Sequence, residues 1–190
     1  MEAISRRDQI LATAAELFAA RGFHGVSVAD LGAACGISGP ALYKHFVSKD
    51  AVLAEMLVSI SEELLRVGGE RVAAAGDPAG AVHGLVAWHV DFALRHRALI
   101  VVQDRDWESL PDEARERVRI LQREYVDLWA AQLRLIDESL TGDRARAMAH
   151  AAFGLINSTP HSGLLPDTAM RRLLSEMAVR SLGVEPRAEG

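Results

Sequence analysis

The sequence predicts an all-α protein with about nine helices. Three observations support this fold class. Apolar residues recur every three or four positions along most of the 190-residue chain, as they do on the buried side of a helix. Serine, threonine or aspartate, which commonly begin helices, precede several of these segments. No segment shows the alternation of apolar and polar residues that indicates a half-buried strand.

The first helix is expected at residues 6–20, after Ser5, whose hydroxyl can accept a hydrogen bond from the first turn. Arg21 and Gly22 follow this helix, and glycine commonly ends a helix. The apolar side of the helix consists of Ile10, Leu11, Ala14, Ala15 and Phe18. We expect this side to be buried.

Residues 26–52 contain one pattern three times: V-S-x-x-x-L, I-S-x-x-x-L and V-S-x-x-x-V. Each serine is a preferred helix N-cap, and the flanking apolar residues have the spacing of a hydrophobic staple. The serines are Ser27, Ser38 and Ser48, and the apolar pairs are Val26 with Leu31, Ile37 with Leu42, and Val47 with Val52. Ser27 and Asp30 also resemble a capping box, with aspartate where glutamate or glutamine is usual.

Because three helices begin so close together, the first two must be short, at about residues 28–35 and 39–45. Gly36 lies between them and fits the left-handed position that follows the end of a helix. Two short helices across a turn that contains glycine form a helix-turn-helix. We therefore expect residues 1–48 to form a three-helix domain of this type.

The remaining sequence, residues 49–190, is expected to form a second helical domain. Its helices are separated by short segments rich in the residues that end or begin helices. These segments are Gly76-Asp77-Pro78, Thr141-Gly142-Asp143 and Pro166-Asp167. Helices are expected at about residues 49–74, 78–96, 98–107, 110–138, 142–158 and 167–182.

Composition narrows the class of protein. Apolar residues make up 49% of the chain and charged residues 25%, as in a globular protein. No apolar run is long enough to span a membrane, and the N-terminal residues lack the apolar core of a signal peptide. The single cysteine, Cys35, excludes an internal disulfide and fits a reducing compartment. We expect a cytoplasmic protein that does not bind membranes.

The net charge of −5 would argue against a nucleic-acid partner if it were spread evenly. Residues 1–50 instead contain five arginines and lysines against five acidic residues, so the rest of the chain has the whole net charge. The two lysines of the chain, Lys44 and Lys49, lie at the second short helix and its exit. A local basic face can bind phosphate on a protein that is acidic overall.

Three stretches, ILATAAELFAARGF, VSVADLGAACGIS and ALYKHFVSKDAVLAEML, resemble the TetR (tetracycline-repressor-like) family of transcriptional regulators. The resemblance covers residues 9–57, and the combination of motifs is highly specific. Beyond it, the chain matches the family only in being helical. The resemblance implies a homodimer that binds a palindromic operator in double-stranded DNA. It further implies release of the operator when a small molecule enters the C-terminal domain, and no enzyme activity.

The second helix of a helix-turn-helix lies in the major groove with its N-terminal residues at the base edges. Gly39, Pro40 and Ala41 take that place here and offer apolar contacts to thymine methyl groups rather than hydrogen bonds. The family often has lysine or arginine at the position of Gly39, so direct base recognition is expected to be weak. The resemblance places Tyr43, His45 and Lys49 at positions that contact phosphates. The predicted DNA-binding residues are Ser27, Ser38, Gly39, Pro40, Ala41, Tyr43, Lys44, His45 and Lys49.

Each of these residues also has a structural interpretation. Tyr43 could pack on the first helix, His45 could be a core residue, and Lys49 could be a solvated charge. The complete motif favours the DNA-binding interpretation, because a motif in its expected structural context is more specific than any single residue. Phe18, Leu31, Leu42 and Phe46 are expected in the core, and Cys35 is expected to be a small buried apolar residue.

Aromatic residues with a few polar groups in the second half of the chain have the composition of a small-molecule pocket. The predicted ligand-binding residues are Trp88, His89, Phe92, Gln103, Trp107, Tyr125, Trp129, Asn157 and His161. Aromatic side chains fill cores more often than they line cavities, so an ordinary core is the alternative. The family resemblance favours the pocket, and its aromatic lining predicts a small lipophilic inducer, for example an organic acid or an acyl thioester. No H-E-x-x-H motif or cysteine pair is present, and we expect no metal and no cofactor.

The last two expected helices have features of a dimer interface. The first contains small residues, and the second has an apolar stripe at helical spacing. Two such helices from each subunit could form a four-helix bundle across a two-fold axis. The predicted interface residues are Met148, Ala152, Ile156, Met170, Leu173, Leu174 and Met177. The alternative is packing within one chain.

Two functions of different classes remain open from the sequence. The leading hypothesis is a ligand-responsive repressor. The second is a helical small-molecule-binding protein or enzyme that retains the helix-turn-helix only as a structural element. The weakly polar Gly39-Pro40-Ala41 favours the second, whereas no nucleophile, base and orienting group are spaced to support catalysis.

Overall fold

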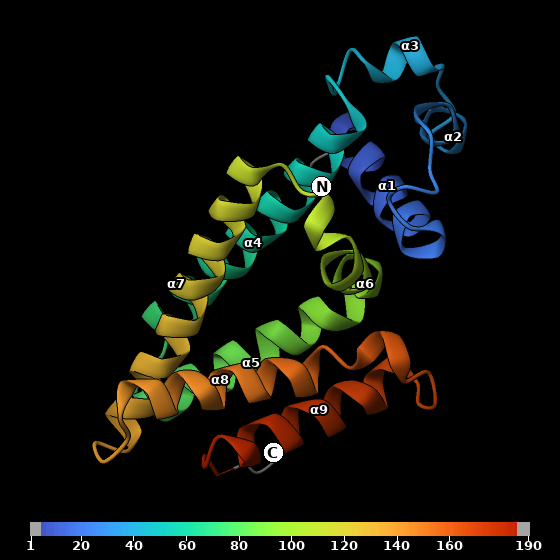
Figure 1. Ribbon diagram of the computed structural model, residues 1–190. Helices are drawn as coiled ribbons and strands as arrows, with labels where there is room; N and C mark the ends of the chain where they lie inside the picture. Colours follow the sequence, from blue (N-terminus) through green and yellow to red (C-terminus); the bar gives the residue numbers. More distant parts are fainter. Residues whose placement is uncertain (1–4, 186–190) are drawn as a thin grey trace. The chain divides into compact units, whose positions relative to one another are not determined.

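The structure is a computed structural model that describes residues 5–185, and within this range it contains nine α-helices and no strand (Figure 1). The predicted all-α fold is therefore confirmed. The helices are α1 (Arg6–Arg21), α2 (Val28–Ala34), α3 (Gly39–Leu42), α4 (Lys49–Ala73), α5 (Pro78–Arg95), α6 (Arg97–Asp106), α7 (Asp112–Ile136), α8 (Gly142–Ile156) and α9 (Asp167–Ser181). Two short 3-10 helices, η1 (Trp107–Ser109) and η2 (Thr159–His161), follow α6 and α8.

The chain divides into two compact units. The first consists of Met1–Ile60 and Ala98–Arg119, and the second of Ser61–Arg97 and Ile120–Gly190. The long helices α4 and α7 each contribute to both units. Helix α6 belongs to the first unit, although it is far in the sequence from the N-terminal helices of that unit. The predicted domains, residues 1–48 and 49–190, are defined by function, and this division stays a prediction. The two compact units have different boundaries.

The expected helix starts are formed by local hydrogen bonds. The hydroxyls of Ser5, Ser27, Ser38 and Thr141 accept bonds from main-chain N–H groups in the first turns of α1, α2, α3 and α8, and Asp77 caps α5 in the same way. Ser48 Oγ accepts the N–H of Ala51 at 3.0 Å in the first turn of α4. These bonds satisfy donors that have no partner inside a helix.

The first unit has its own core, in which the buried side chains include Ile10, Phe18, Leu31, Leu42, Phe46, Val52, Leu53 and Leu57. The predicted core positions Phe18, Leu31, Leu42 and Phe46 are each at most 3% exposed, so that prediction is confirmed. Cys35 is half-buried and packs against this core. One predicted contact is wrong: Val47 is 84% exposed, while Val52 is fully buried. The staple expected between these two valines therefore does not form, because the chain turns Val47 outward before α4.

The turn of the helix-turn-helix has a defined geometry. Gly36 has φ +66°, and the N–H groups of Ile37 and Gly36 donate to Gly32 O at 2.9 Å and Ala33 O at 3.1 Å. This is the Schellman arrangement, which ends a helix through a left-handed residue. A Cβ at Gly32 would lie 2.9 Å from Ile37 O, so α2 and the turn approach each other through glycine. The sequence predicted the role of Gly36 and missed that of Gly32.

In the second unit α5, α8 and α9 pack against one another (Figure 1). The inward side of α8 consists of Ala145, Ala149, Ala152 and Ile156, all of them fully buried. Small side chains on α8 let its neighbours approach closely. Within residues 5–185 no helix is long and apolar enough to cross a membrane.

Candidate DNA-binding surface and aromatic ligand core

The second short helix of the helix-turn-helix presents a small, mostly apolar surface. Ser38 Oγ accepts the N–H of Ala41 at 3.3 Å and fixes the start of α3, and Pro40 occupies the first turn, where it needs no hydrogen-bond donor. Pro40, Tyr43 and Lys44 are exposed, and Gly39 and Ala41 are partly exposed. A side chain at Gly39 would meet open space. This surface is free to contact a partner.

The helical part of this surface is shorter than expected. Regular helix ends at Leu42, and two tight turns follow, in which Lys44 N–H donates to Ala41 O at 3.2 Å and His45 N–H to Leu42 O at 2.9 Å. Tyr43, Lys44 and His45 therefore project from a turn rather than from a helix. Tyr43 is 54% exposed and His45 is half-buried.

Two arginines of α1 bind main-chain carbonyls at the end of α2 and in the turn after α3. Arg6 Nη2 donates to Cys35 O at 2.6 Å at the end of α2. Arg7 donates to His45 O, forms an ion pair with Glu55, and lies 4.2 Å from the centre of the Phe46 ring. A cation at a helix C-terminus also interacts favourably with the helix dipole. From the sequence, Arg6 and Arg7 entered only the charge balance of residues 1–50. Their structural roles could not be predicted, because the carbonyls that they bind are distant in the sequence.

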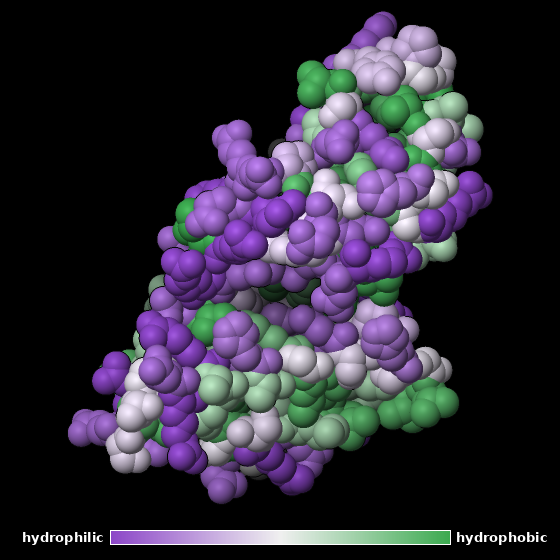
Figure 2. Space-filling model, in the orientation of Figure 1, coloured by the Kyte–Doolittle hydropathy of each residue, from purple (hydrophilic) through white to green (hydrophobic). Residues whose placement is uncertain are grey.

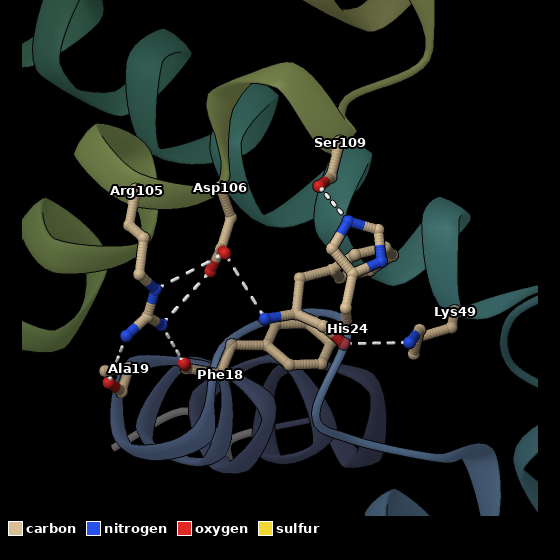
Figure 3. Close-up of polar contacts among 8 residues, drawn as sticks. Phe18, Ala19, His24, Lys49, Arg105, Asp106 and Ser109 are labelled. Carbon is tan, nitrogen blue, oxygen red and sulfur yellow. Dashed lines mark hydrogen bonds and ion pairs between the residues drawn. The ribbon is translucent and has the colours of Figure 1, made fainter.

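Lys49 is bound within the first unit. Its Nζ donates to Phe23 O and Val26 O, both at 2.8 Å, and lies 4.2 Å from the centre of the Phe23 ring. Figure 3 shows the bond to Phe23 O. Two of the three donors of the ammonium group are thus used by the loop before α2. Contact of Lys49 with a DNA phosphate stays a prediction, and the geometry adds a structural role that the sequence did not indicate.

Ser27 is exposed at the start of α2, but its groups are paired with Asp30. Its N–H donates to Asp30 Oδ2 at 2.8 Å, and its hydroxyl accepts the N–H of Asp30 at 3.1 Å. The predicted capping box is therefore present. The hydrogen bonds from Ser27 lower the pKa of the Asp30 carboxyl, which stays negative beside any phosphate bound here.

In the second unit aromatic rings surround a buried histidine. The rings of His89, Tyr125 and Phe153 are nearly parallel and contact one another, with ring centres 5.7 Å apart for His89 and Tyr125, 4.7 Å for His89 and Phe153, and 5.4 Å for Tyr125 and Phe153. Trp129 meets the His89 and Phe153 rings edge-on, at 6.0 and 5.0 Å. A Cβ at Gly68 of α4 would lie 2.7 Å from Tyr125 Cε2, so glycine makes room for this ring. We call these four residues, His89, Tyr125, Trp129 and Phe153, the aromatic cluster.

The polar atoms of His89 and Tyr125 are paired with each other and with Asn157, whereas Trp129 Nε1 is buried without a hydrogen-bond partner. His89 Nε2 lies 3.1 Å from Asn157 Oδ1, and His89 Nδ1 lies 3.3 Å from the Tyr125 hydroxyl. Burial lowers the pKa of His89 to about 4, so the ring is neutral at pH 7. Because Asn157 Oδ1 can only accept, Nε2 donates the hydrogen and Nδ1 accepts the Tyr125 hydroxyl. Burial also raises the pKa of Tyr125, which stays protonated.

Trp88, Phe92 and His96 form a second group of aromatic residues, on α5 and at its C-cap. Trp88 Nε1 donates to Leu64 O at 3.3 Å, and the Trp88 and Phe92 rings are 6.3 Å apart. The His96 ring lies 4.9 Å from Phe92, and its Nε2 is buried without a hydrogen-bond partner. Burial, together with repulsion from Arg95, lowers the pKa of His96.

The structure brings together six of the nine predicted ligand-binding residues in the second unit: Trp88, His89, Phe92, Tyr125, Trp129 and Asn157. Gln103 and Trp107 instead lie in the first unit, where Trp107 packs against the core. His161 is exposed in η2. Phe153 was missed, although it lies one helical turn before Asn157 on α8 and so shares its face.

The predicted dimer interface needs correction. Ala152, Ile156, Met170 and Leu174 are at most 4% exposed within this chain, so their side chains pack internally and cannot contact a partner. Leu173 and Met177 are 41% and 46% exposed, and Met148 is partly exposed. The spacing did not indicate which side of α9 faces outward, and an interface on α8 and α9 stays a prediction. Figure 2 shows apolar residues gathered over α8 and α9 on the face that it displays.

Known proteins resemble this chain in both sequence and fold. A family model described as "Bacterial regulatory proteins, tetR family" matches residues 10–56, and one described as "Tetracyclin repressor-like, C-terminal domain" matches residues 75–182. The HTH-type transcriptional repressor KstR2 of Rhodococcus jostii is 31% identical over 129 residues, 67% of this chain and 63% of that protein. The chain thus matches a little less than two thirds of the length of that relative.

Solved structures share the fold over nearly the whole chain. A TetR-family transcriptional regulator from Bordetella parapertussis has a TM-score of 0.82 at 25% identity, and the match covers 99% of this chain and 100% of that one. The protein AibR, solved in complex with isovaleryl coenzyme A and operator DNA, has a TM-score of 0.71 at 19% identity, with 91% and 97% covered. At 19% identity, the similarity to AibR shows a shared fold only.

Proposed function

The chain belongs to the TetR family of bacterial regulatory proteins, and we propose that it is a DNA-binding repressor released from a palindromic operator by a small lipophilic molecule. The observation that supports this best is the exposed surface of α3 and the following turn. Arg6 binds the end of α2 and Arg7 binds the turn after α3, so this surface is preorganised for a partner. We assign DNA binding to residues 1–48 and ligand binding and dimerisation to residues 49–190.

The proposed contacts divide into two kinds. Pro40 and Ala41 approach base edges and recognise thymine methyl groups through apolar contact. Tyr43 and Lys44, both exposed on the turn after α3, contact phosphates and position the helix in the groove. With few polar groups at the start of α3, much of the affinity comes from phosphate contacts and therefore depends on salt.

DNA binding is tested with duplexes selected by the protein from a randomised pool, titrated across a salt series. Lys44→Ala should weaken binding to all duplexes similarly and reduce the slope of log affinity against log salt by about one. Tyr43→Phe should also weaken binding, because it removes one hydroxyl. The second tyrosine of the chain provides the control: Tyr125 is buried in the second unit, so Tyr125→Phe should bind DNA like the parent.

A protein that selects no duplex would contradict the proposal. It would favour the alternative, a small-molecule-binding protein or enzyme that keeps the helix-turn-helix only structurally. The absence of polar side chains on Gly39, Pro40 and Ala41 is the observation in favour of that alternative. We propose that the chain is not itself an enzyme, as its relatives are regulators.

We place the inducer beside the aromatic cluster and the neighbouring Trp88 and Phe92. The polar groups there are those of His89, Tyr125 and Asn157 and the indole N–H groups of Trp88 and Trp129, and the rest of the lining is apolar, which suits a mostly apolar ligand with one polar end. Lipophilic acids and their coenzyme A thioesters are the class to test first, and the thioester bound by AibR supports this choice.

The inducer is identified by its coupling to DNA. A ligand displaces an operator only if it binds the released conformation better than the DNA-bound one, and the coupling is typically about 5- to 150-fold in affinity. Acyl chains of increasing length, free and as thioesters, are titrated with and without the selected duplex. The true inducer must bind more weakly in the presence of the duplex, by the factor by which it weakens DNA binding.

The two tyrosines again separate the sites. Tyr125→Phe should change the affinity for the inducer while DNA affinity stays that of the parent, and Tyr43→Phe should do the reverse. A ligand that binds equally well with and without the duplex is not the inducer. If Tyr125→Phe and Phe92→Leu leave the affinity of a true inducer unchanged, the aromatic cluster is an ordinary core.

A further inference from the structure

The loop of residues 22–26 joins α1 to the helix-turn-helix and determines where α2 begins. It contains two glycines with separate tasks. Gly22 has φ +78°, and a Cβ at Gly25 would lie 2.3 Å from Arg21 O. Such a loop has little stiffness of its own, because glycine restricts the backbone less than other residues do. Its position therefore depends on what holds it from outside.

On one side the loop is held by the end of α6, about eighty residues later in the sequence. Asp106 Oδ1 accepts the N–H of Phe23 at 3.3 Å, and Asp106 Oδ2 forms an ion pair with Arg105 Nη2 at 3.2 Å (Figure 3). Arg105 also donates to Ala19 O at 3.0 Å and to Phe18 O, at the C-terminal end of α1. Asp106 is only 6% exposed.

Two further contacts complete the support. Lys49 of α4 binds two carbonyls of the loop, Phe23 O and Val26 O. Ser109 of η1 hydrogen-bonds His24 Nε2 at 3.0 Å. The first residue of this segment after Gly22 is thus bound by Asp106 of α6 and by Lys49 of α4, and Lys49 also binds its last residue. Figure 3 shows the contacts at Phe23 and His24.

Apolar residues of α6 also pack into the core of the first unit, among them the fully buried Val102. A buried carboxylate with a charged partner gives little net stability compared with apolar residues of the same volume. Directional hydrogen bonds to main-chain atoms instead fix the angle and position of the chain that they bind. Here they fix the last turn of α1 and the first residues of the loop, immediately before α2.

We infer that Arg105 and Asp106 are positioning residues for operator recognition, although they lie outside the helix-turn-helix and are not expected to touch DNA. They orient α2 and α3 relative to α1 by holding the loop in one conformation. This inference rests on the proposed repressor function.

The test compares specific and non-specific DNA binding. Asp106→Ala removes the acceptor for Phe23 N–H and leaves Arg105 without its carboxylate. We expect the affinity for the selected duplex to fall about tenfold or more. Affinity for an unrelated duplex at low salt should change much less, because phosphate contacts do not require an exact orientation. Asp106→Asn keeps an acceptor oxygen and should recover part of the specific affinity.

Controls separate positioning from general stability. Arg105→Gln should lower the ratio of specific to non-specific affinity, as Asp106→Ala does. Arg134→Gln removes an arginine of the second unit that also donates to a main-chain carbonyl, Leu140 O at 3.3 Å, and should leave the ratio unchanged. All affinities are measured well below the unfolding temperature of each variant. Hydrogen exchange in the absence of DNA should show faster exchange of the Phe23 amide in Asp106→Ala.

Two results would overturn the inference while leaving the repressor function intact. The first is that the variants Asp106→Ala and Arg105→Gln both bind the selected duplex with the specificity of the parent. The other is unchanged exchange of the Phe23 amide, which would mean that Asp106 does not hold the loop. Failure of the parent itself to select any duplex is a different outcome, and it overturns the repressor function together with this inference.

Discussion

His89 is a titratable group in a fully buried, apolar site, and its environment makes stability depend on pH. The ring is enclosed by Tyr125, Phe153 and Trp129, and its two nitrogens are paired with Asn157 and Tyr125. The neutral ring suits these partners because one nitrogen donates and the other accepts. A protonated ring would have two donors, and the Tyr125 hydroxyl would have to reverse its hydrogen bond.

The resulting prediction concerns acid. The pKa of His89 is about 4 in the folded protein and about 6.5 in the unfolded chain. Between these values the unfolded state binds a proton that the folded state does not, so acid favours unfolding. We expect the free energy of unfolding to fall by about 3 kcal/mol as the pH drops from 6.5 to 4. His96, whose pKa is also lowered, adds to the loss.

Chemical unfolding followed at several pH values between 7 and 4 measures this effect. His89→Gln should be less stable than the parent at pH 7, because the buried ring packs against Tyr125, Phe153 and Trp129, but its stability should depend less on pH. The exposed His161→Gln is the control and should follow the parent profile. A His89→Gln profile as steep as that of the parent would show that His89 does not cause the loss.

At the scale of elements, the helix-turn-helix depends on close approach at Gly32. A Cβ there would lie 2.9 Å from Ile37 O and 3.2 Å from Gly39 N, and both atoms are main chain. We predict that Gly32→Ala lowers the free energy of unfolding by about 1–3 kcal/mol, because the turn must move. The same movement displaces Ser38 and α3, so operator affinity should fall as well.

Gly39→Ala is the matched control for that substitution. A side chain at Gly39 meets nothing within 4 Å, so its stability should stay within about 0.5 kcal/mol of the parent. Urea unfolding and titration with the selected duplex measure both effects. If Gly32→Ala matches Gly39→Ala in stability, the α2–turn contact is looser than the distances indicate.

The helix starts could be predicted from sequence because capping is local. Ser27 and Asp30 meet three residues apart, and Gly36 follows the helix that it ends, so each interaction lies within one short segment. The contacts of Lys49 could not be predicted, because its acceptors are carbonyls 23 and 26 residues away. Val47 shows the same limit, since staple spacing alone does not determine which way the chain turns.

The candidate sites were predictable to different degrees for a similar reason. His89, Phe92 and Trp88 lie within one helix, so their proximity follows from helical spacing. Whether Trp107 joins them depends on which unit α6 and η1 pack against, and the structure places that segment with the first unit. The predicted interface residues include side chains that are buried within the chain, because both sides of α9 have apolar residues, and the interface itself stays a prediction.

At the scale of the whole molecule, the proposed function requires two copies. A dimer on a palindromic operator presents its recognition helices to half-sites about 34–36 Å apart, or a multiple of one DNA turn. A monomer contacts only one half-site. The exposed apolar residues Leu173 and Met177 lie one helical turn apart on α9, and this is the surface that we propose for the second copy.

We predict that Met177→Asp produces a folded monomer. The side chain is 46% exposed in the single chain, so aspartate there should cost the fold little. In a dimer the charge would be buried without a partner, at a cost of several kcal/mol. Leu135→Asp is the matched control, because Leu135 is an apolar residue of α7 that is 64% exposed.

Sedimentation measures the association, and circular dichroism checks that the variants remain folded. Met177→Asp should sediment as a monomer and bind a two-half-site duplex no better than a single half-site, whereas Leu135→Asp should behave like the parent. A folded Met177→Asp that remains a tight dimer would move the interface away from this side of α9. Dissociation by Leu135→Asp would instead place the end of α7 in the interface. In either case the protein would hold its two recognition helices through a surface other than the one proposed.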